Sequence, residues 1–478
     1  MRPNLQTWIR AAGATLTAIV LLGSAAPSVR AQSPDAQEQS PDVQKLKERV
    51  KQLEQTVEEL KGQIGVIEEA QKQPNRAAGE TVAAPANVTA EGEMPAAKPA
   101  KDDKGGNTFE VYGFAMLDMG YDFKQNHPDW FDTVRPTKLP AFRNEFGPDG
   151  KTYFGVRQSR LGVRTSTPTK YGQLKTVFEF ELFGTGADAG QTTFRLRHAY
   201  GELGNFGAGQ YWTVFGDTDA YPNSFEYWGP NGLVWFRNLQ VRWMPYKGKN
   251  SLTLALERPG ASGDQGLYAD RIALQGIKPK LAWPDLTGNV RFDRDWGHIQ
   301  FSGLVRSIRW VDTNNDQFDL GGSAVGLGGS VSSHLNFSPN NVGRFQLTYG
   351  KGIENYMNDA PVDIGVKNNS GDPSKPVRGV ALPVLGFSTF LDHTWNKRFN
   401  SAIGYSMLNI SNSDGQAPSA FRRGHYALGN VLFAPVDKVT LGGEFQWGRR
   451  ENFSDGWGVN DYRIQFSFKY SFSKVWEF

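Results

Sequence analysis

From residue 107 to the end of the chain, polar and apolar side chains alternate in segments of about ten residues. The last segment shows the pattern most clearly. Its apolar positions are Tyr462, Ile464, Phe466, Phe468, Tyr470 and Phe472, and its polar positions are Arg463, Gln465, Ser467, Lys469 and Ser471. Alternation predicts a β-strand, because successive side chains point to opposite faces. A strand in a soluble sheet has about five or six residues. This longer one is typical of a tilted strand that crosses a bilayer.

Similar segments recur throughout this region. In LKTVFEFELFG, Phe178, Phe180 and Leu182 alternate with Glu179 and Glu181. Turn-rich stretches separate the segments, and no convincing amphipathic helix interrupts them. About 370 residues at ten or so per strand, plus turns and loops, predict roughly sixteen strands. We therefore expect an all-β fold, a transmembrane antiparallel β-barrel over residues 107–478.

The apolar face of this barrel is expected to contact lipid. Aromatic residues cluster near the strand ends, as they do at membrane interfaces. The other face carries many charged side chains, which suits a water-filled lumen. No stretch approaches eighteen uninterrupted apolar residues, and a chain exported without an anchoring helix can span a membrane only as a closed barrel. The bacterial outer membrane is the expected location.

The first 106 residues have a different character. Residues 1–31 resemble a secretory signal peptide, with Arg2 and Arg10 before a short apolar run and expected cleavage after Ala31. The chain has no cysteine, so it has neither a disulfide nor a cysteine for an N-terminal lipid anchor. Residues 74–106 are rich in Ala, Pro, Gly and charge, which predicts a flexible linker.

Residues 32–73 contain an unbroken heptad pattern that predicts a short periplasmic α-helical coiled coil. Its apolar positions are Val43, Leu46, Val50, Leu53, Val57, Leu60, Ile64 and Ile67. About three and a half heptads are marginal alone, so the barrel is expected to hold the copies together. Val at a with Leu at d favours dimers in isolated coiled coils. Contacts between barrels would be far larger than those of this short seam, so the barrels are expected to decide the number of copies.

The lumen face carries a row of arginines. Arg160 and Arg164 have the opposite parity to Leu161 and Val163. In TTFRLRHAYGEL, Arg195 and Arg197 alternate with Phe194, Leu196, His198 and Tyr200, and Arg242 alternates with Leu239, Val241 and Trp243. Glu179 and Glu181 share this wall. A planar guanidinium binds a carboxylate through two parallel hydrogen bonds, so such a wall favours organic anions. Alternatively, the arginines serve only to tie strands together through Glu179, Glu181 and Glu202. The net charge of +3 is small, so a preference for anions would depend on where the charges lie.

These motifs resemble the DcaP-like trimeric outer-membrane porins. The resemblance is carried by VYGFAMLDMGYDF at 111–123 and by GQYWTVFGDTDAYPNSFEYWGPNGLVWFRNLQVRW at 209–243. QSRLGVR, FEFELFG and FRLRHAYGEL are shared more widely among trimeric porins. The resemblance covers nearly the whole chain, most specifically 109–245.

The resemblance implies a homotrimer of sixteen-stranded barrels that passes small anionic solutes, dicarboxylates among them. It also implies that 213–232 fold into the pore, and that 311–335 and 353–380 are extracellular loops. The pore-lining residues would be Arg160, Arg164, Arg195, Arg197 and Arg242, with Glu179 and Glu181 on the same wall and Asp217 and Asp219 on the loop.

Other functions are less consistent with the sequence. Six scattered histidines and no nucleophile at a telling spacing argue against an enzyme. DTNNDQFD lacks the glycine and the final glutamate of a calcium loop, so no metal or cofactor is expected. A phosphate-selective porin and a barrel that tethers the envelope remain alternatives.

The expected partners are further copies of the chain, outer-membrane lipids and lipopolysaccharide, and small anionic solutes. The terminal Phe478 resembles the signal that barrels present to their assembly machinery, which is therefore a further expected partner. No nucleic acid is expected.

Overall fold

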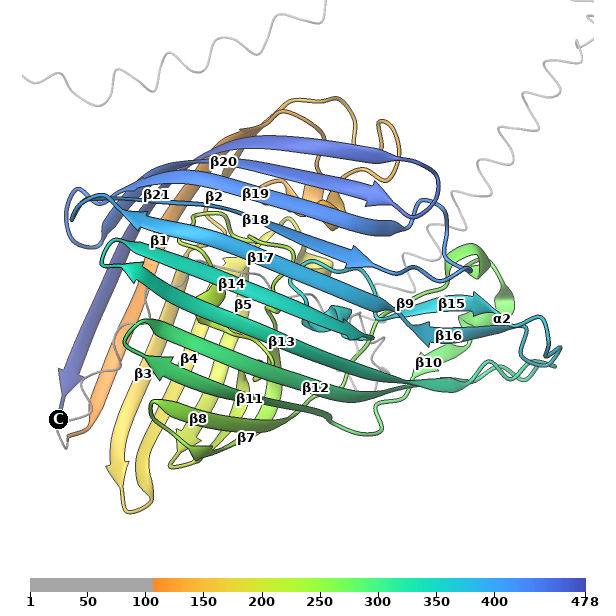
Figure 1. Ribbon diagram of the computed structural model, residues 1–478, viewed down its shortest axis with the longest axis horizontal. Helices are drawn as coiled ribbons and strands as arrows, with labels where there is room; N and C mark the ends of the chain where they lie inside the picture. Colours follow the sequence, from red (N-terminus) through yellow and green to blue (C-terminus); the bar gives the residue numbers. More distant parts are fainter. Residues whose placement is uncertain (1–105) are drawn as a thin grey trace, which may run out of the picture. The chain divides into compact units, whose positions relative to one another are not determined.

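The computed structural model describes residues 106–478. The expected signal peptide, the coiled coil and all but the last residue of the linker lie outside the described residues. The described part is a closed antiparallel β-barrel (Figure 1).

The main sheet contains 18 strand segments. Two of these, β2 and β3, pair with successive parts of β1 and occupy one position of the barrel. The short β10 (Ile277–Pro279) pairs with the end of β12 beyond β11 and shares the position of β11. Sixteen positions remain, as predicted. The barrel strands are β1 (Thr108–Asp122), β2 (Lys151–Gly155), β3 (Arg160–Thr169), β4 (Gly172–Phe183), β5 (Thr192–Leu203), β6 (Phe206–Trp212), β7 (Arg237–Tyr246), β8 (Asn250–Glu257), β11 (Asp285–Arg294), β12 (Gly297–Asp312), β13 (Gly322–Ser338), β14 (Asn341–Lys351), β17 (Pro383–Thr394), β18 (Phe399–Ile410), β19 (Phe421–Phe433), β20 (Val439–Asn452) and β21 (Gly458–Glu477).

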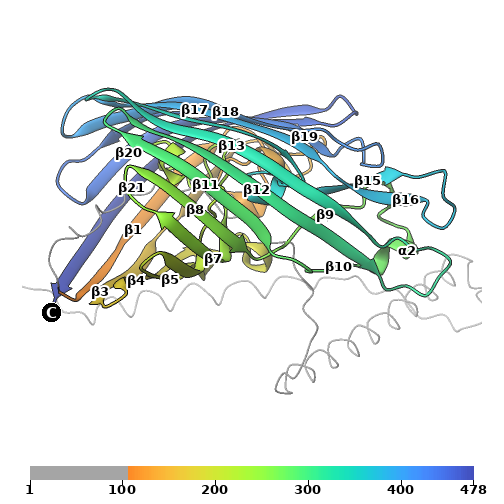
Figure 2. The ribbon, with the colours of Figure 1, turned by 60° about the horizontal axis from the view of Figure 1, so that its bottom comes forward.

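Pairing between the first and last strands closes the barrel. The register of β1 with β21 runs without a break from Thr108 opposite Glu477 to Asp122 opposite Arg463. One end of the barrel has short turns, such as residues 170–171 and 204–205. The other end has the long connections 123–150, 213–236, 258–284 and 352–382, and Figure 2 shows much of 258–284 and 352–382 far from the C-terminus.

Small elements occupy the long connections. The three-stranded sheet is made of β9 (Gly263–Asp264), β15 (Ile364–Asn368) and β16 (Val377–Ala381), and β10 (Ile277–Pro279) pairs with the end of β12. The helices are α2 (Ile272–Gln275) and the 3-10 turns η2 (Pro128–Trp130), η3 (Pro136–Lys138), η4 (Gly186–Asp188), η5 (Thr218–Ala220), η6 (Gly266–Tyr268) and η7 (Glu354–Tyr356). Within residues 106–478, no helix has the length and apolar character needed to cross a membrane.

The alternation predicted for the last strand is confirmed. In β21 the side chains of Tyr462, Ile464 and Phe466 are exposed on the outer surface, whereas Arg463 and Gln465 are fully buried inside. The same division holds in β4, where Phe178 and Phe180 are exposed and Glu179 and Glu181 are buried. The apolar face of the barrel therefore points outward and the polar face points inward.

One parity assignment was wrong. His198 and Tyr200 were predicted to share the outer face with Phe194 and Leu196, yet both are buried in the lumen. The register of β4 with β5 shifts between Glu179 opposite His198 and Phe180 opposite Leu196, which leaves Arg197 as an extra residue. Such a β-bulge places two consecutive side chains on one side of the strand. Arg197 and His198 thus both point inward.

The assignment of 311–335 to a loop was also wrong. Only 313–321 connect strands there, and β13 begins at Gly322, paired with β12 and β14. The segment is rich in glycine and serine, which weakens the sequence pattern of a strand. The small residues leave room for two loops inside the barrel, because Gly328 lies against Ile353 and Phe215 of these loops. The stretch 353–380 does belong to a connection, but its first residues pack in the lumen.

Candidate functional site

A loop between β6 and β7, residues 213–236, turns back into the lumen; we call it the inserted loop. The backbone N–H of Val214 donates to Glu257 of β8 at 3.0 Å, and that of Val234 donates to Gln346 of β14 at 2.7 Å. Asn231 accepts a hydrogen bond from Ser406 of β18 at 2.8 Å. These partners are inward-facing residues of well-separated strands, so the inserted loop crosses the interior. This location agrees with the prediction for 213–232.

Two further connections hold the inserted loop in place. From 123–150, the guanidinium of Arg135 lies 3.4 Å from the ring centre of Trp228 and forms an ion pair with Asp359 at 2.9 Å. From 352–382, the carbonyl of Asn358 accepts a hydrogen bond from the indole of Trp228 at 3.0 Å. Trp228 is completely buried between them. The three connections together narrow the lumen.

Glu226 links the inserted loop to the connection 123–150. Its carboxyl group accepts hydrogen bonds from the backbone N–H groups of Val134, at 3.0 Å, and Gly229. Burial raises the pKa of Glu226 to about 7, although these hydrogen bonds oppose the shift. The protonated form is therefore favoured in the folded protein below neutral pH.

The raised pKa predicts a stability that depends on pH. A carboxyl whose pKa is higher in the folded state contributes stability that is fully present below the ordinary value of about 4.3. That contribution is lost as the pH rises through the folded-state pKa of about 7. The melting temperature of the barrel in detergent should fall between pH 5 and pH 8, and the fall should be smaller in E226Q. An equal fall in E226Q would contradict the role of Glu226.

Where the inserted loop meets the wall of β3, β4, β5 and β7, arginines surround two glutamates. The members of this arginine–glutamate cluster are Arg160, Glu179, Glu181, Arg195, Arg197 and Arg237. Four guanidinium groups face two carboxylates, so two positive charges are not balanced within the cluster. Tyr227 of the inserted loop donates a hydrogen bond to Glu181 at 2.5 Å. Burial and the charge of Glu181 raise the pKa of Tyr227, which keeps its hydroxyl protonated.

The arginines of the cluster are not equivalent. Arg197 is bound to Glu179 at 2.5 Å and to Glu181 at 2.7 Å, and its side chain is 1% exposed. Arg160 lies farther from the same carboxylates, at 3.6 and 3.7 Å. Arg195 contacts Glu181 at 3.3 Å, and its side chain is 13% exposed. Removing one partner of a buried ion pair typically costs about 3–5 kcal/mol, so Arg197 has a structural role, whereas Arg195 can reach a solute.

Two predicted residues lie outside the cluster, nearer the short turns. Arg164 is 3.8 Å from Glu110 and lies over the ring of Tyr112, with its side chain 39% exposed. Arg242 donates to Gln240 at 2.7 Å and to the carbonyl of Trp212 at 2.6 Å. Arg164 is thus paired with an acid other than the two glutamates of the cluster. Glu202 pairs with Lys247, at 2.7 Å, and not with the predicted arginines.

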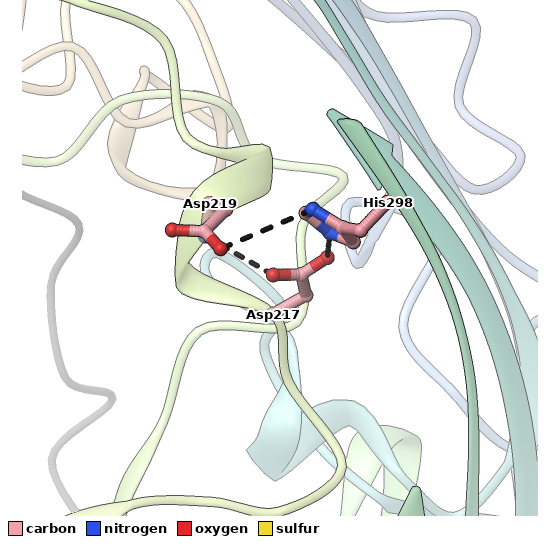
Figure 3. Close-up of side chains that lie close together, drawn as sticks. All are labelled: Asp217, Asp219 and His298. Carbon is pink, nitrogen blue, oxygen red and sulfur yellow. Dashed lines mark hydrogen bonds and ion pairs between the residues drawn. The ribbon is translucent and has the colours of Figure 1, made fainter. Parts of the chain in front are cut away.

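Asp217 and Asp219 lie on the inserted loop, as predicted, and face His298 of β12 (Figure 3). Asp217 is 2.8 Å from Nε2 of His298 and accepts a hydrogen bond from Ser332 at 2.6 Å. Arg291 binds Asp219 at 2.6 Å and Asp217 at 3.5 Å. Burial alone would raise the pKa of Asp217, but His298, Arg291 and Ser332 hold it below its ordinary value.

One ligand atom from each of Asp217, Asp219 and His298 lies within 4.8 Å of the other two, a spacing that could hold a metal ion. The guanidinium of Arg291 already forms ion pairs with both carboxylates. A cation would have to displace this guanidinium and its two ion pairs. The group is therefore better suited to fasten the inserted loop to the wall than to bind a metal.

Several residues of this site were not identified from the sequence. Arg237 follows the inserted loop directly, and its inward parity is evident only once the start of β7 is known. His198 enters the lumen through the bulge in β5. Arg291 and His298 could have been found by parity in β11 and β12, but nothing local to those strands indicates that Asp217 lies opposite.

Comparisons with known proteins agree with this architecture. The family model of the DcaP outer membrane protein matches residues 29–472. A solved structure of the outer membrane channel DcaP of Acinetobacter baumannii is similar, with a TM-score of 0.62 and 20% identity, over 77% of this chain and 98% of that one. An anion-selective porin from Comamonas acidovorans has a TM-score of 0.50 and 11% identity, over 77% of this chain and 100% of that one. A search of curated proteins finds no match.

Proposed function

Because the chain belongs to the DcaP outer membrane protein family and is an outer-membrane channel of the porin type, we propose that it allows small organic anions to diffuse passively. Dicarboxylates are the preferred solutes in this proposal. The supporting observation is the arginine–glutamate cluster, where four guanidinium groups face two carboxylates beside the inserted loop. A narrow, poorly hydrated passage strengthens the effect of the two unbalanced charges.

The pore-lining residues of this proposal are Arg160, Arg195, Arg164 and Arg242. Arg195 and Arg160 supply the charge at the inserted loop, and Arg164 and Arg242 extend it toward the short turns. Glu179 and Glu181 hold the arginines in position. Their presence counts against a phosphate-selective pore, for which an uninterrupted row of cations would be expected.

Block of the channel current by a dicarboxylate tests this function. In a planar bilayer, millimolar succinate should interrupt the chloride current of the wild-type channel more than acetate does, because two carboxylates can engage two guanidiniums. The dication 1,4-diaminobutane, which is similar in length, should have little effect. Equal block by the diamine and by succinate would rule out an anion-preferring passage.

We also propose that the protein is a homotrimer, as the resemblance to trimeric porins implies, with the N-terminal segment in the periplasm. Light scattering in detergent should give three times the mass of the mature chain. A variant that lacks residues 32–106 should keep three copies, because contacts between barrels are expected to exceed those of a short coiled coil. A truncated variant that is monomeric would show that the N-terminal segment holds the copies together.

A further inference from the structure

The segment 277–284, IKPKLAWP, begins as β10 alongside the end of β12 and leads to the start of β11, at the end of the barrel with the long connections. Leu281 and Trp283 are exposed, and Trp283 is 61% accessible. Residues 281–284 border a hollow that is also lined by Leu239, Val241 and Leu256, outward-facing residues of β7 and β8. The hollow is therefore on the apolar outer face rather than in the lumen.

One cation borders this apolar hollow, and three more lie on the segment that leads to it and on the adjoining β12. Arg258 lies on its border. Lys278 and Lys280 precede Leu281, and the N–H of Lys280 donates to the carbonyl of Arg309 at 2.9 Å, which continues the pairing of β10 with β12. Arg309 is exposed and alternates with the buried Arg306 and Ile308, so it points outward. We call Arg258, Lys278, Lys280 and Arg309 the outer cationic patch.

The outer cationic patch has no acidic partner among residues 106–478. The structure has many ion pairs inside the lumen, but none of the four side chains of the patch takes part in one. Lys280 lies opposite Arg309 on the same face of the sheet, where β12 is paired with β13 on its other side, and like charges in that position destabilise a sheet. A ligand with negative charge would relieve this repulsion.

Along this surface, apolar side chains are followed by cationic side chains, as the acyl chains of a lipid leaflet are followed by its phosphate groups. On β12, Phe301 and Val305 face outward, and Arg309 follows beyond them. On the neighbouring β11, Leu286 faces outward opposite Val305. Tryptophan is enriched at the membrane interface, and lysine and arginine side chains extend to the phosphate level. In outer-membrane barrels the long loops are extracellular, which places this end at the outer leaflet.

We propose that this surface binds a phosphorylated lipid of the outer leaflet. One acyl chain lies in the hollow against Leu239, Val241 and Leu256, and the phosphate lies against the outer cationic patch. The hollow supplies apolar contact, and the patch supplies charge-assisted hydrogen bonds to the phosphate oxygens. This binding concerns the outside of the barrel and does not depend on what passes through the lumen.

Retention of lipid A by the purified full-length protein tests this proposal. Native mass spectrometry in detergent should show that the wild type retains bis-phosphorylated lipid A, and that K278Q/K280Q/R309Q retains about fivefold less, as expected when three charge-assisted contacts are lost. The charge-conserving variant K278R/K280R/R309K should retain it. A matched control, K170Q/K397Q/R398Q, removes three cations at the opposite end and should bind as the wild type does.

Two further measurements identify the part of the lipid that is recognised. Dephosphorylated lipid A, with the same acyl chains, should be retained as weakly by the wild type as lipid A is by the triple glutamine variant. Millimolar inorganic phosphate should not displace lipid A, because it cannot use the hollow. Equal retention by K278Q/K280Q/R309Q and the wild type, or no effect of removing the phosphates, would overturn the proposal. Displacement by inorganic phosphate would also overturn it, since the patch would then be a site for free phosphate.

Discussion

Replacing Gly232 by valine should raise the single-channel conductance about twofold or more, because a sixteen-stranded barrel without an internal constriction leaves a wide aqueous channel. Gly232 is the point at which the inserted loop touches β17 and β18. A Cβ at this position would collide with the backbone oxygens of Phe387 and Met407 and would lie 2.7 Å from the nitrogen of Phe387. Backbone atoms of two strands cannot move aside, so the inserted loop must move instead.

The barrel itself should fold in this variant. Gly232 belongs to no barrel strand, and the closing register of β1 with β21 lies elsewhere in the sheet. Heat modifiability on a gel checks the folded state, and planar-bilayer recording measures the conductance. The matched control is G371V, since a Cβ at Gly371 meets nothing within 4 Å. A folded G232V channel with the conductance of the wild type would show that the inserted loop does not limit the passage.

Much of the barrel could be predicted because alternation is a local property. The outward and inward faces of β4 and β21 follow directly from the order of Phe178, Glu179, Phe466 and Gln465 along the chain. The number of strands follows from length and spacing. The failures have local causes: the bulge at Arg197 reverses the parity of the residues that follow it, and the small residues of β13 conceal a strand.

The candidate site was predictable only in part. Parity placed Arg160, Arg195 and Arg197 on the wall with Glu179 and Glu181, and the structure brings these five together. Parity cannot give height along the barrel, so Arg164 and Arg242 were grouped with them although they lie nearer the short turns. Contacts made by the inserted loop, such as that of Asp217 with His298, join residues 81 positions apart and have no local signal.

The same contacts change the expected role of the arginines. Two interpretations were open from the sequence, a selective wall and a set of ties between strands. Arg197 fits the second, because it is buried against both glutamates. Arg195 fits the first better, because part of its side chain is accessible. One cluster can therefore serve both purposes, with some arginines fixing the glutamates and others acting on the solute.

We expect unbalanced positive charge at the inserted loop to make the channel prefer anions. Neutralising Arg160 and Arg195 together leaves Arg197 and Arg237 against Glu179 and Glu181, which balances the charge of the cluster. These two arginines are the ones to replace, since Arg160 has the longest ion pairs of the cluster and Arg195 is partly exposed. The control variant K170Q/K397Q removes two cations at the short turns. Salt at 0.1 M largely screens the effect of such exposed charges beyond about 10 Å.

The reversal potential across a potassium chloride gradient tests this claim most directly. Wild type and K170Q/K397Q should both show a preference for chloride, and R160Q/R195Q should show a permeability ratio close to that of free diffusion. A folded R160Q/R195Q channel whose reversal potential equals that of the wild type would contradict the account, and the arginines would then serve only as ties to Glu179 and Glu181.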